Sequence, residues 1–318
     1  HFISENDEIK YYTDPMPRSY FLQYNASTNP GGYQTSSEKR ELEHELIERI
    51  ITWLDAFNLV DESIDFDTND DGVLDSITFM MSGEDDGWLS ILWPHKWSLY
   101  KGYIKWSDTF RDDAPTINGL NVYNYNVNLL GYSKDYEFTD SVGVLAHEMF
   151  HMIGGPDLYS YDGYSYLQNT GYWDLMDKHD KLPTHMLGYM KEYYGGWLNE
   201  VREITENGIY TLEPIEHNAN NLYKINTKYS NEYLYMEYRT SDNLYSVSEY
   251  NKSGLILYRV NLDNQDEGNI RGYNGEEESL NELFVFRPLI QDISAPIELP
   301  KDVYTTIPYG KIEYAALS

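Results

Sequence analysis

The stretch VLAHEMFHMIGGPDLY, residues 144–159, decides how this chain can be interpreted, because it combines helical spacing with side chains that bind metal ions. Residues four apart lie one turn above each other on a helix, so His147 and His151 can present ring nitrogens to one ion. Glu148 lies on the same side. The spacing therefore predicts a helix that carries a metal site.

A third ligand is expected just beyond this helix, because a tetrahedral catalytic zinc takes three protein ligands and one water. Gly154 suits a helix end in the left-handed conformation, which would turn the chain back and bring Asp157 within reach. This predicts His147, His151 and Asp157 as zinc ligands. One alternative stays open, in which a distant glutamate such as Glu192 is the third ligand and Asp157 is only a turn residue.

The composition restricts both the ligands and the partners. The 318 residues include no cysteine, so any zinc must be held by histidine and carboxylate. With 53 acidic and 23 basic residues the formal net charge is −30, which would repel a phosphate backbone and argues against a nucleic-acid partner. The chain begins at His1, and no run approaches the roughly 18 apolar residues of a membrane helix. We therefore expect a trimmed, soluble product without a membrane span, acting as a monomer.

The predicted secondary structure changes near residue 199. Before it, Thr35 and Glu38 form a capping box ahead of a helical apolar pattern, and residues 77–81 are typical of a buried strand. After it come short alternating stretches: GIYTLEPI, NLYKINT, EYLYMEYR and GLILYRVN. We predict an α+β catalytic domain over 1–199, with a twisted sheet and the active-site helix, and a β-sandwich-like domain over 200–318.

An acidic loop, DFDTNDDGVLD at 65–75, resembles a calcium-binding loop. Four side chains and one main-chain carbonyl fall at the ligand positions of an EF-hand loop, and they are Asp67, Asn69, Asp71, Asp75 and, through its carbonyl, Val73. Thr78 stands where the bidentate glutamate is expected, so the loop is not a complete EF-hand. We predict a structural Ca²⁺ here; an Asp/Asn-rich turn without an ion is the alternative. The loop at 261–269 is a second candidate.

These motifs together resemble the immune inhibitor A family of secreted bacterial zinc metalloproteases, whose members share an HExxHxxGxxD zinc motif and the Met-turn of metzincins. The similarity extends over nearly the whole chain. Besides HEMFHMIGGPDLY it includes DFDTNDDGVLD and WPHKW upstream, and GYWDLM, LPTHMLGYMKEYYGGW, EYLYMEYR and GLILYRVN downstream.

The resemblance implies a metzincin-like fold and a secreted, extracellular zinc endopeptidase that hydrolyses peptide bonds of extracellular proteins. It implies zinc on His147, His151 and Asp157, Glu148 as the catalytic base, and Met176 beneath the metal. Two positions depart from the family pattern. Phe150 stands where members commonly have glycine, and Gly155 where they have a larger apolar residue. Neither position is a predicted ligand, but both lie close to the motif, so they should affect the shape of the pocket.

The expected chemistry is attack of a zinc-bound water on a peptide carbonyl, with Glu148 as general base. A further donor usually shares the oxyanion charge, and Tyr172, His179 and His185 are candidates. The sequence does not identify substrate-binding residues. The alternative function is a catalytically silent secreted binding or adhesion module that retains the protease fold.

A histidine outside the motif also needs an interpretation. His95 lies in WPHKW, between Trp93 and Trp97. A histidine among tryptophans is more often packed and hydrogen-bonded than functional, so we expect a structural role.

Overall fold

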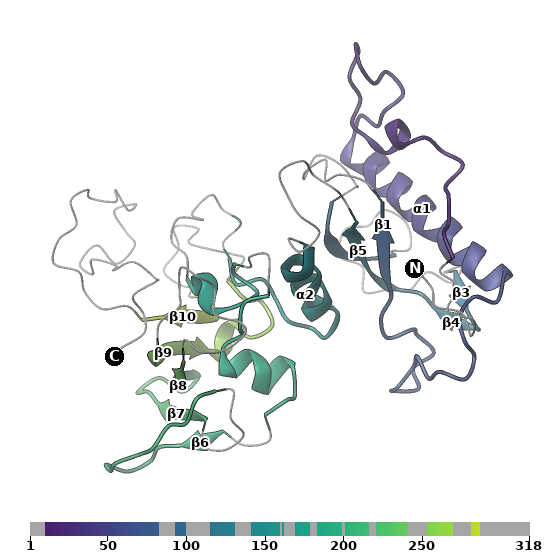
Figure 1. Cartoon of the computed structure of the whole chain (residues 1–318). Coiled ribbons are helices and arrows are strands. Elements are labelled where there is room, and N and C mark those ends of the chain that lie inside the picture. Colours follow the sequence, from purple (N-terminus) through teal and green to yellow (C-terminus); the bar gives the residue numbers. More distant parts are fainter. Residues whose placement is uncertain are drawn as a thin grey trace. The chain divides into compact units, whose positions relative to one another are not determined.

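The computed structural model (Figure 1) describes residues 10–82, 93–99, 115–130, 141–159, 161, 169–178, 183–198, 201–215, 221–240, 253–269 and 281–286. Contacts divide the chain into two compact units, 1–141 and 142–318. Each unit has a helix and a sheet of its own, so the chain is α+β, as predicted.

The long helix of the N-terminal unit, α1 (Ser36–Ala56), begins where the sequence predicts. The Thr35 side chain accepts a hydrogen bond from the Glu38 amide, and the Glu38 carboxylate accepts one from the Thr35 amide, which completes the capping box. One face of α1 is buried through apolar side chains that recur at helical spacing: Leu46, Ile47, Ile50, Ile51 and Leu54. This face packs in the core of the N-terminal unit.

The sheet of this unit has the order β1-β5-β2. The predicted strand is confirmed as β1 (Thr78–Met81), which runs parallel to β5 (Asn124–Leu129), while β2 (His95–Ser98) is antiparallel to β5. Phe79, Tyr125 and Val127 are buried in the same core as α1. The described residues of this unit also form a 3-10 turn, η1 (Arg18–Phe21), and a two-stranded sheet of β3 (Thr116–Ile117) and β4 (Leu120–Asn121).

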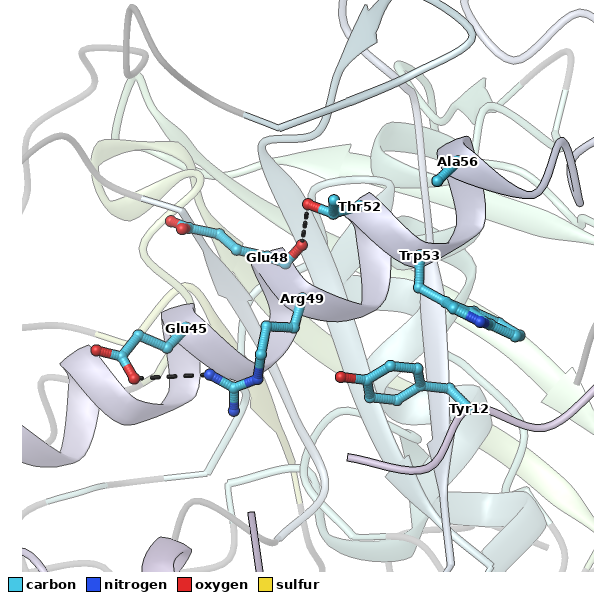
Figure 2. Close-up of a pocket in the computed structure, with 7 residues that line it drawn as sticks. All are labelled: Tyr12, Glu45, Glu48, Arg49, Thr52, Trp53 and Ala56. Atoms are coloured by element: carbon cyan, nitrogen blue, oxygen red, sulfur yellow. Dashed lines mark hydrogen bonds and ion pairs between the residues drawn. The ribbon is translucent and has the colours of Figure 1, made fainter. Parts of the chain in front are cut away.

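The segment that leads into η1 lies along α1 and leaves a shallow pocket of about 490 Å³ there (Figure 2). Arg49 binds the carboxylate of Asp14 through two nitrogens, at 2.9 and 3.3 Å. The ring of Tyr12 lies 5.5 Å from that of Trp53. These contacts fasten the segment to the helix, and the pocket lining contains none of the predicted site residues.

The C-terminal unit contains the motif helix, α2 (Ser141–Met152), as predicted. Its buried side chains include His147, Glu148 and Phe150, whereas Val142 and Met149 from its apolar stripe are exposed. The face that α2 turns into its own unit is therefore the face that carries the motif.

The C-terminal unit also contains a five-stranded sheet, in the order β10-β9-β8-β7-β6 (Figure 1). Three of the predicted strands are confirmed, as β7 (Leu222–Asn226), β8 (Glu232–Arg239) and β9 (Gly254–Asn261), which pair antiparallel. The remaining elements are short: η4 (Gly171–Trp173), the π-helical turn η5 (Met190–Tyr194), β6 (Arg202–Glu203), η6 (Leu262–Asn264) and β10 (Leu283–Val285).

The prediction of a strand at 208–215 is wrong. Ile209 and Tyr210 are exposed, and the stretch joins the sheet only through an isolated bridge between Pro214 and Tyr238. Pro214 lacks the amide that a ladder needs, and only Ile215 at the end of the stretch reaches the core.

One core connects the sheet with the motif helix. Tyr235 and Tyr258 from β8 and β9 lie in the same apolar cluster as Phe150 of α2, Met176 and Leu187. In the described residues the buried sheet face is thus covered by segments preceding residue 199, and a second sheet that would complete a sandwich is not found among them. The predicted boundary at 199–200 does not coincide with the division of contacts, and as a functional boundary it stays a prediction.

Within the described part of the chain, every helix is too short or too polar to traverse a lipid bilayer.

Candidate metal centre

Three side chains of the motif converge in the C-terminal unit. His147, His151 and Asp157 each offer one ligand atom, and these atoms lie within 4.8 Å of one another. The two Nε2 atoms lie 3.1 Å and 3.2 Å from Oδ1 of Asp157, respectively. His147 and Asp157 are buried, and His151 is partly buried. The group predicted from sequence spacing could therefore hold a metal ion.

The orientation of both imidazoles is fixed through the nitrogen that does not face Asp157. Nδ1 of His147 lies 3.0 Å from the Leu175 carbonyl, and Nδ1 of His151 lies 2.7 Å from the Gly155 carbonyl. A carbonyl only accepts, so each Nδ1 carries the proton. In the neutral rings Nε2 is then the atom with the lone pair, which is the arrangement that protein metal sites use to orient histidine ligands.

The buried oxygen at the centre of the group tests whether a cation fits. Oδ1 of Asp157 accepts no hydrogen bond within the described residues, although both Nε2 atoms are close to it. A buried carboxylate oxygen without a donor is costly. One divalent cation would be bound by this oxygen and the two ring nitrogens together, and histidine with carboxylate is a ligand set that zinc accepts. The residues present therefore fit a zinc ion.

The second oxygen of Asp157 is occupied by Tyr161, whose hydroxyl donates to Oδ2. This hydrogen bond leaves Oδ1 as the atom that faces the histidines, and so favours coordination through one oxygen. Nearby, the ring of Tyr159 stacks on His147 at 6.2 Å between centroids. Burial and the charge of Asp157 raise the pKa of the Tyr159 phenol, which stays protonated at neutral pH.

The pKa values of two candidate ligands, His147 and Asp157, are shifted by their charged neighbours in the group. Burial acts to raise the pKa of Asp157, but His147 and His151 outweigh it and hold that pKa far below its usual range. Burial acts to lower the pKa of His147, but the carboxylates of Asp157 and Glu148 outweigh it and raise that pKa. The site thus concentrates negative charge next to the two imidazoles, which favours a positive ion.

Glu148, the predicted base, is buried beside the ligands. Its carboxylate acts through its charge on both His147 and Tyr159. This places an acid–base group next to the candidate metal position, on the same helix as two of the ligands.

The chain turns from the helix to the third ligand as the sequence predicts. Gly154 has φ +100°, a conformation that residues with side chains rarely adopt, and its amide donates to the His151 carbonyl at 3.1 Å. The Gly154 bend therefore lets Asp157 approach the ligands on α2.

Phe150 and Gly155, the two positions that depart from the family pattern, lie directly against each other. A Cβ atom at Gly155 would overlap the ring of Phe150. Phe150 therefore fills the space that a side chain at position 155 would take, and its ring packs near Tyr194 and Trp197.

The predicted Met-turn lies against both ends of the motif. Met176 is fully buried, and its carbonyl accepts from the Leu158 amide at 2.8 Å. Its neighbour Leu175 provides the carbonyl for His147. Asp174 holds the turn, accepting from the Met176 and Leu187 amides at 2.8 and 2.7 Å. Burial raises the pKa of Asp174 to about 7, against the effect of these two amides.

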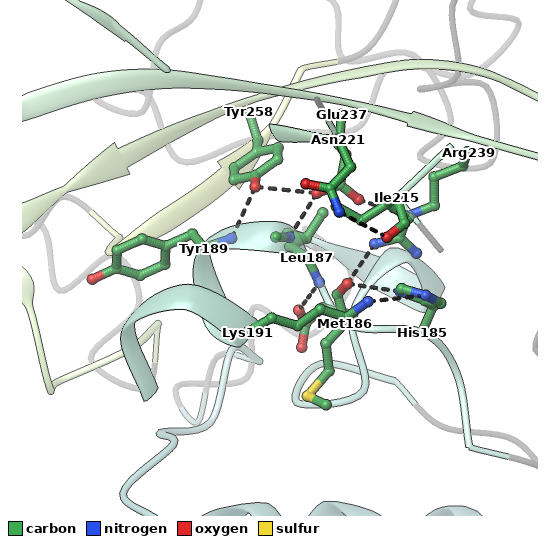
Figure 3. Close-up of polar contacts among 12 residues, drawn as sticks. His185, Met186, Leu187, Tyr189, Lys191, Ile215, Asn221, Glu237, Arg239 and Tyr258 are labelled. Carbon is green, nitrogen blue, oxygen red and sulfur yellow. Dashed lines mark hydrogen bonds and ion pairs between the residues drawn. The ribbon is translucent and has the colours of Figure 1, made fainter. Parts of the chain in front are cut away.

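A polar network attaches the segment at 185–191, which follows the predicted Met-turn, to the sheet (Figure 3). The buried Glu237 of β8 accepts from the Gly188 amide at 2.6 Å and from Arg239 at 2.6 Å, and Arg239 donates to the Met186 carbonyl at 2.9 Å. The Tyr258 hydroxyl accepts from the Tyr189 amide at 3.1 Å and donates to Glu237 at 3.2 Å. The sheet thereby fixes residues 186–189.

This network accounts for His185, one of the candidate oxyanion donors. Its Nδ1 donates to the Met186 carbonyl at 2.9 Å, and its Nε2 lies 3.0 Å from the Lys191 ammonium, which donates to it. Burial and the charges of Arg239 and Lys191 lower the pKa of His185 to about 2. Both ring nitrogens are therefore engaged in structural contacts. Tyr172 is partly buried in the core, and His179 lies outside the described residues.

The alternative third ligand is directed elsewhere. The carboxylate of Glu192, on η5, accepts from the Tyr235 hydroxyl at 3.2 Å. Among the described residues, the group that could hold a metal ion has Asp157 as its third member.

In the predicted calcium loop, Gly72 has φ +79°, as the glycine at the sharp turn of such a loop requires. Its acids are used internally, because Asp67 accepts from the Asp71 and Gly72 amides at 3.0 and 2.8 Å, and Asp71 accepts from the Val73 amide at 2.8 Å. The Asp75 carboxylate accepts a hydrogen bond from the Thr68 hydroxyl, and the side-chain amide of Asn69 donates one to the Asp71 carboxylate. Hydrogen bonds of this kind do not require an ion, so calcium binding stays a prediction.

His95 has the structural role expected for it. Its Nε2 binds Oε1 of the buried Glu43 at 2.8 Å, its Nδ1 lies 2.7 Å from the Trp93 carbonyl, and Tyr125 donates to the same Glu43 oxygen. This cluster belongs to the core of the N-terminal unit.

Sequence reasoning missed the residues that support the ligands. Asp174 had a usable signal, since it is an acid between apolar residues in GYWDLM. Tyr161 is one of 32 tyrosines, and Asn269, which hydrogen-bonds beside Asp157, lies in the loop considered as a second calcium site. Nothing local distinguishes either residue.

Models of known protein families do not match this chain, and a search of curated protein sequences finds no match either. The similarity to immune inhibitor A proteases therefore depends on the motifs alone, and the chemistry of the site must carry any functional conclusion.

Proposed function

We propose that the protein is a secreted, zinc-dependent endopeptidase with a metzincin-like catalytic domain, acting as a monomer on extracellular proteins or peptides. The observation that carries the proposal is the donorless Oδ1 of Asp157, set 3.1 and 3.2 Å from the two imidazole nitrogens. The resemblance of the motifs to immune inhibitor A proteases supports the same conclusion, and the strongly acidic composition argues against a nucleic-acid substrate.

His147, His151 and Asp157 would hold the zinc. When bound, zinc acts as a Lewis acid on a carbonyl and lowers the pKa of a coordinated water. Glu148 accepts a proton as water oxygen bonds to the peptide carbonyl carbon. Glu148 then returns a proton to the amide nitrogen as the carbon–nitrogen bond breaks, which leaves a carboxylic acid and an amine.

The surroundings of the ligands support this role by holding each group in place. The Leu175 and Gly155 carbonyls keep the Nε2 atoms of His147 and His151 available, and Tyr161 leaves one oxygen of Asp157 for the ion.

The decisive experiment compares two glutamates. The purified protein should hydrolyse casein, lose this activity to a chelator and regain it with zinc. Glu148→Ala should keep its zinc while turnover falls by about 10²–10⁴-fold, the usual contribution of a general base. Glu192→Ala, which removes the carboxylate bound by Tyr235, should keep both zinc and activity.

Wild-type cleavage by Glu148→Ala would overturn the proposal. A wild-type protein that binds zinc but cleaves nothing in a broad peptide library would instead favour the secreted binding or adhesion module.

A further inference from the structure

The loop that follows β9 and η6 holds the backbone of the third candidate ligand. The Asn269 amide donates to the Asp157 carbonyl at 2.9 Å, and its side-chain nitrogen donates to the Leu158 carbonyl at 3.0 Å. Asn269 is buried, with 1% of its surface exposed. Two successive carbonyls of the ligand segment thus have donors from one residue far along the chain.

The same asparagine is fixed to the sheet. Its side-chain nitrogen also donates to the Leu283 carbonyl at 2.9 Å, and its side-chain oxygen accepts from the Leu283 amide at 3.1 Å. Both amide hydrogens and the amide oxygen are therefore used. Asn269 connects the ligand segment to β10 with no freedom to rotate.

Gly268 brings this loop unusually close to the ligand. It has φ +61°, and a Cβ atom there would overlap the Asp157 carbonyl and lie 2.9 Å from Cβ of Pro156. Any side chain at position 268 would push on the backbone of Asp157.

The buried carboxylate of Glu282 holds the loop that contains Gly268 and Asn269. Glu282 accepts from the Gly268 amide at 2.8 Å, from the Tyr189 hydroxyl at 2.9 Å and from the Tyr194 hydroxyl at 2.7 Å. Glu282 is fully buried. The loop is thus held by buried hydrogen bonds where it meets the segment of the third candidate ligand.

We infer that Gly268 and Asn269 position the third metal ligand, so that the C-terminal sheet is part of the metal site although it contributes no ligand. The inference rests on the proposed function, since it assumes that Asp157 binds zinc. Helix α2 fixes the two histidines, but Asp157 lies beyond its end, where Leu158 is held by the Met176 carbonyl on one side and by Asn269 on the other. Residues that orient a ligand contribute about 10–100-fold to metal affinity.

The test compares Asn269→Ala with Asn261→Ala, measuring zinc affinity by competition with a chromophoric chelator. Asn261 is buried in the same segment, and its side chain accepts from the Asp263 amide. We expect Asn269→Ala to bind zinc about 10-fold or more weakly, and Asn261→Ala to bind it as the wild type does. The visible spectrum of the Co²⁺ form should change only in Asn269→Ala, because it reports ligand geometry.

A second pair keeps the test valid if Asn269→Ala fails to fold. Gly268→Ala crowds the Asp157 carbonyl, whereas Gly188→Ala crowds the Leu222 side chain in the same unit. Only Gly268→Ala should weaken zinc binding and alter the Co²⁺ spectrum.

The outcomes separate the two proposals. If the wild type binds no zinc, the proposed function fails and the inference fails with it. If the wild type binds zinc and both Asn269→Ala and Gly268→Ala match their controls in affinity and spectrum, only the inference is overturned.

Discussion

Both units contain a cluster of histidine and buried carboxylate, and the clusters differ in how their hydrogen bonds are aligned. In the N-terminal unit, Nε2 of His95 makes an aligned hydrogen bond of 2.8 Å to Glu43. In the C-terminal unit, the two Nε2 atoms approach Oδ1 of Asp157 at 3.1 and 3.2 Å, yet that oxygen accepts no hydrogen bond among the described residues. The hydrogen bonds of the first arrangement satisfy its carboxylate, whereas the second has the donor set that a metal ion could complete.

The two clusters are also alike in their tyrosines, because in each cluster a tyrosine hydroxyl donates a hydrogen bond to the carboxylate. Tyr125 donates to Glu43 in the buried core, and the half-exposed Tyr161 donates to Asp157. Each cluster therefore combines histidine, tyrosine and a carboxylate, which is Glu43 in one and Asp157 in the other. The number of histidines and the direction of their nitrogens distinguish the structural pair from the candidate metal site.

The largest expected difference is in metal binding. Asp157→Ala should weaken zinc binding by more than about 100-fold, because a ligand contributes more than an outer-shell partner does. Glu43→Gln should leave zinc affinity unchanged. Metal content after dialysis, measured by mass spectrometry, checks both. Equal zinc loss in the two variants would remove the distinction between the clusters.

The next effect is on stability and concerns the N-terminal cluster. Glu43→Gln should lower the free energy of unfolding by about 3–5 kcal/mol, because it breaks a buried pair and leaves His95 without its carboxylate. Chemical denaturation followed by circular dichroism measures it.

The same pair should depend on pH in a defined direction. Burial acts to raise the pKa of Glu43, but His95 and the hydrogen bonds from His95 and Tyr125 outweigh it and lower the pKa below the ordinary 4.5. The pair's contribution should thus be complete above the ordinary pKa and be lost as the pH falls through the lower, folded value. The stability difference between wild type and Glu43→Gln should shrink with acidification, and a difference that grows would contradict the assignment.

A smaller effect should separate the two tyrosines. Tyr125→Phe should cost about 1.5–3 kcal/mol of stability, as expected for a hydrogen bond to a charged group, and leave zinc binding intact. Tyr161→Phe should do the reverse, weakening zinc binding by about 10-fold with little loss of stability. Paired denaturation and zinc-competition measurements check this. Identical profiles for the two variants would show that the tyrosines are not specific to their clusters.

The smallest effect is expected at the predicted calcium loop. This loop differs from both clusters, because its carboxylates accept hydrogen bonds from backbone amides of the same loop. Calcium should raise the thermal unfolding temperature of the wild type by a few degrees, as about 1 kcal/mol does for a protein of this size. Asp71→Asn should reduce the shift, while Asp263→Asn, in the other acidic loop, should not. A thermal scan with calcium or a calcium chelator distinguishes them, and an unchanged wild type would contradict the prediction.

Local rules were sufficient for the elements that carry their own signals. The capping box of Thr35 and Glu38 fixed the start of α1, and the left-handed Gly154 fixed the end of α2. The same rules failed at 208–215, where alternation resembled a strand but Ile209 found no core. Periodicity reports which face could be buried, and only packing decides whether it is.

The sequence by itself determined the candidate ligand group, His147, His151 and Asp157, because the spacing of these residues on one helix and its bend is a local property of the backbone. Tertiary structure decided what surrounds them: the Leu175 carbonyl on His147, Tyr161 on Asp157, and Asn269 on the segment that follows. These partners come from separate parts of the chain, and a hydrogen bond between distant residues leaves no periodic trace in either of them.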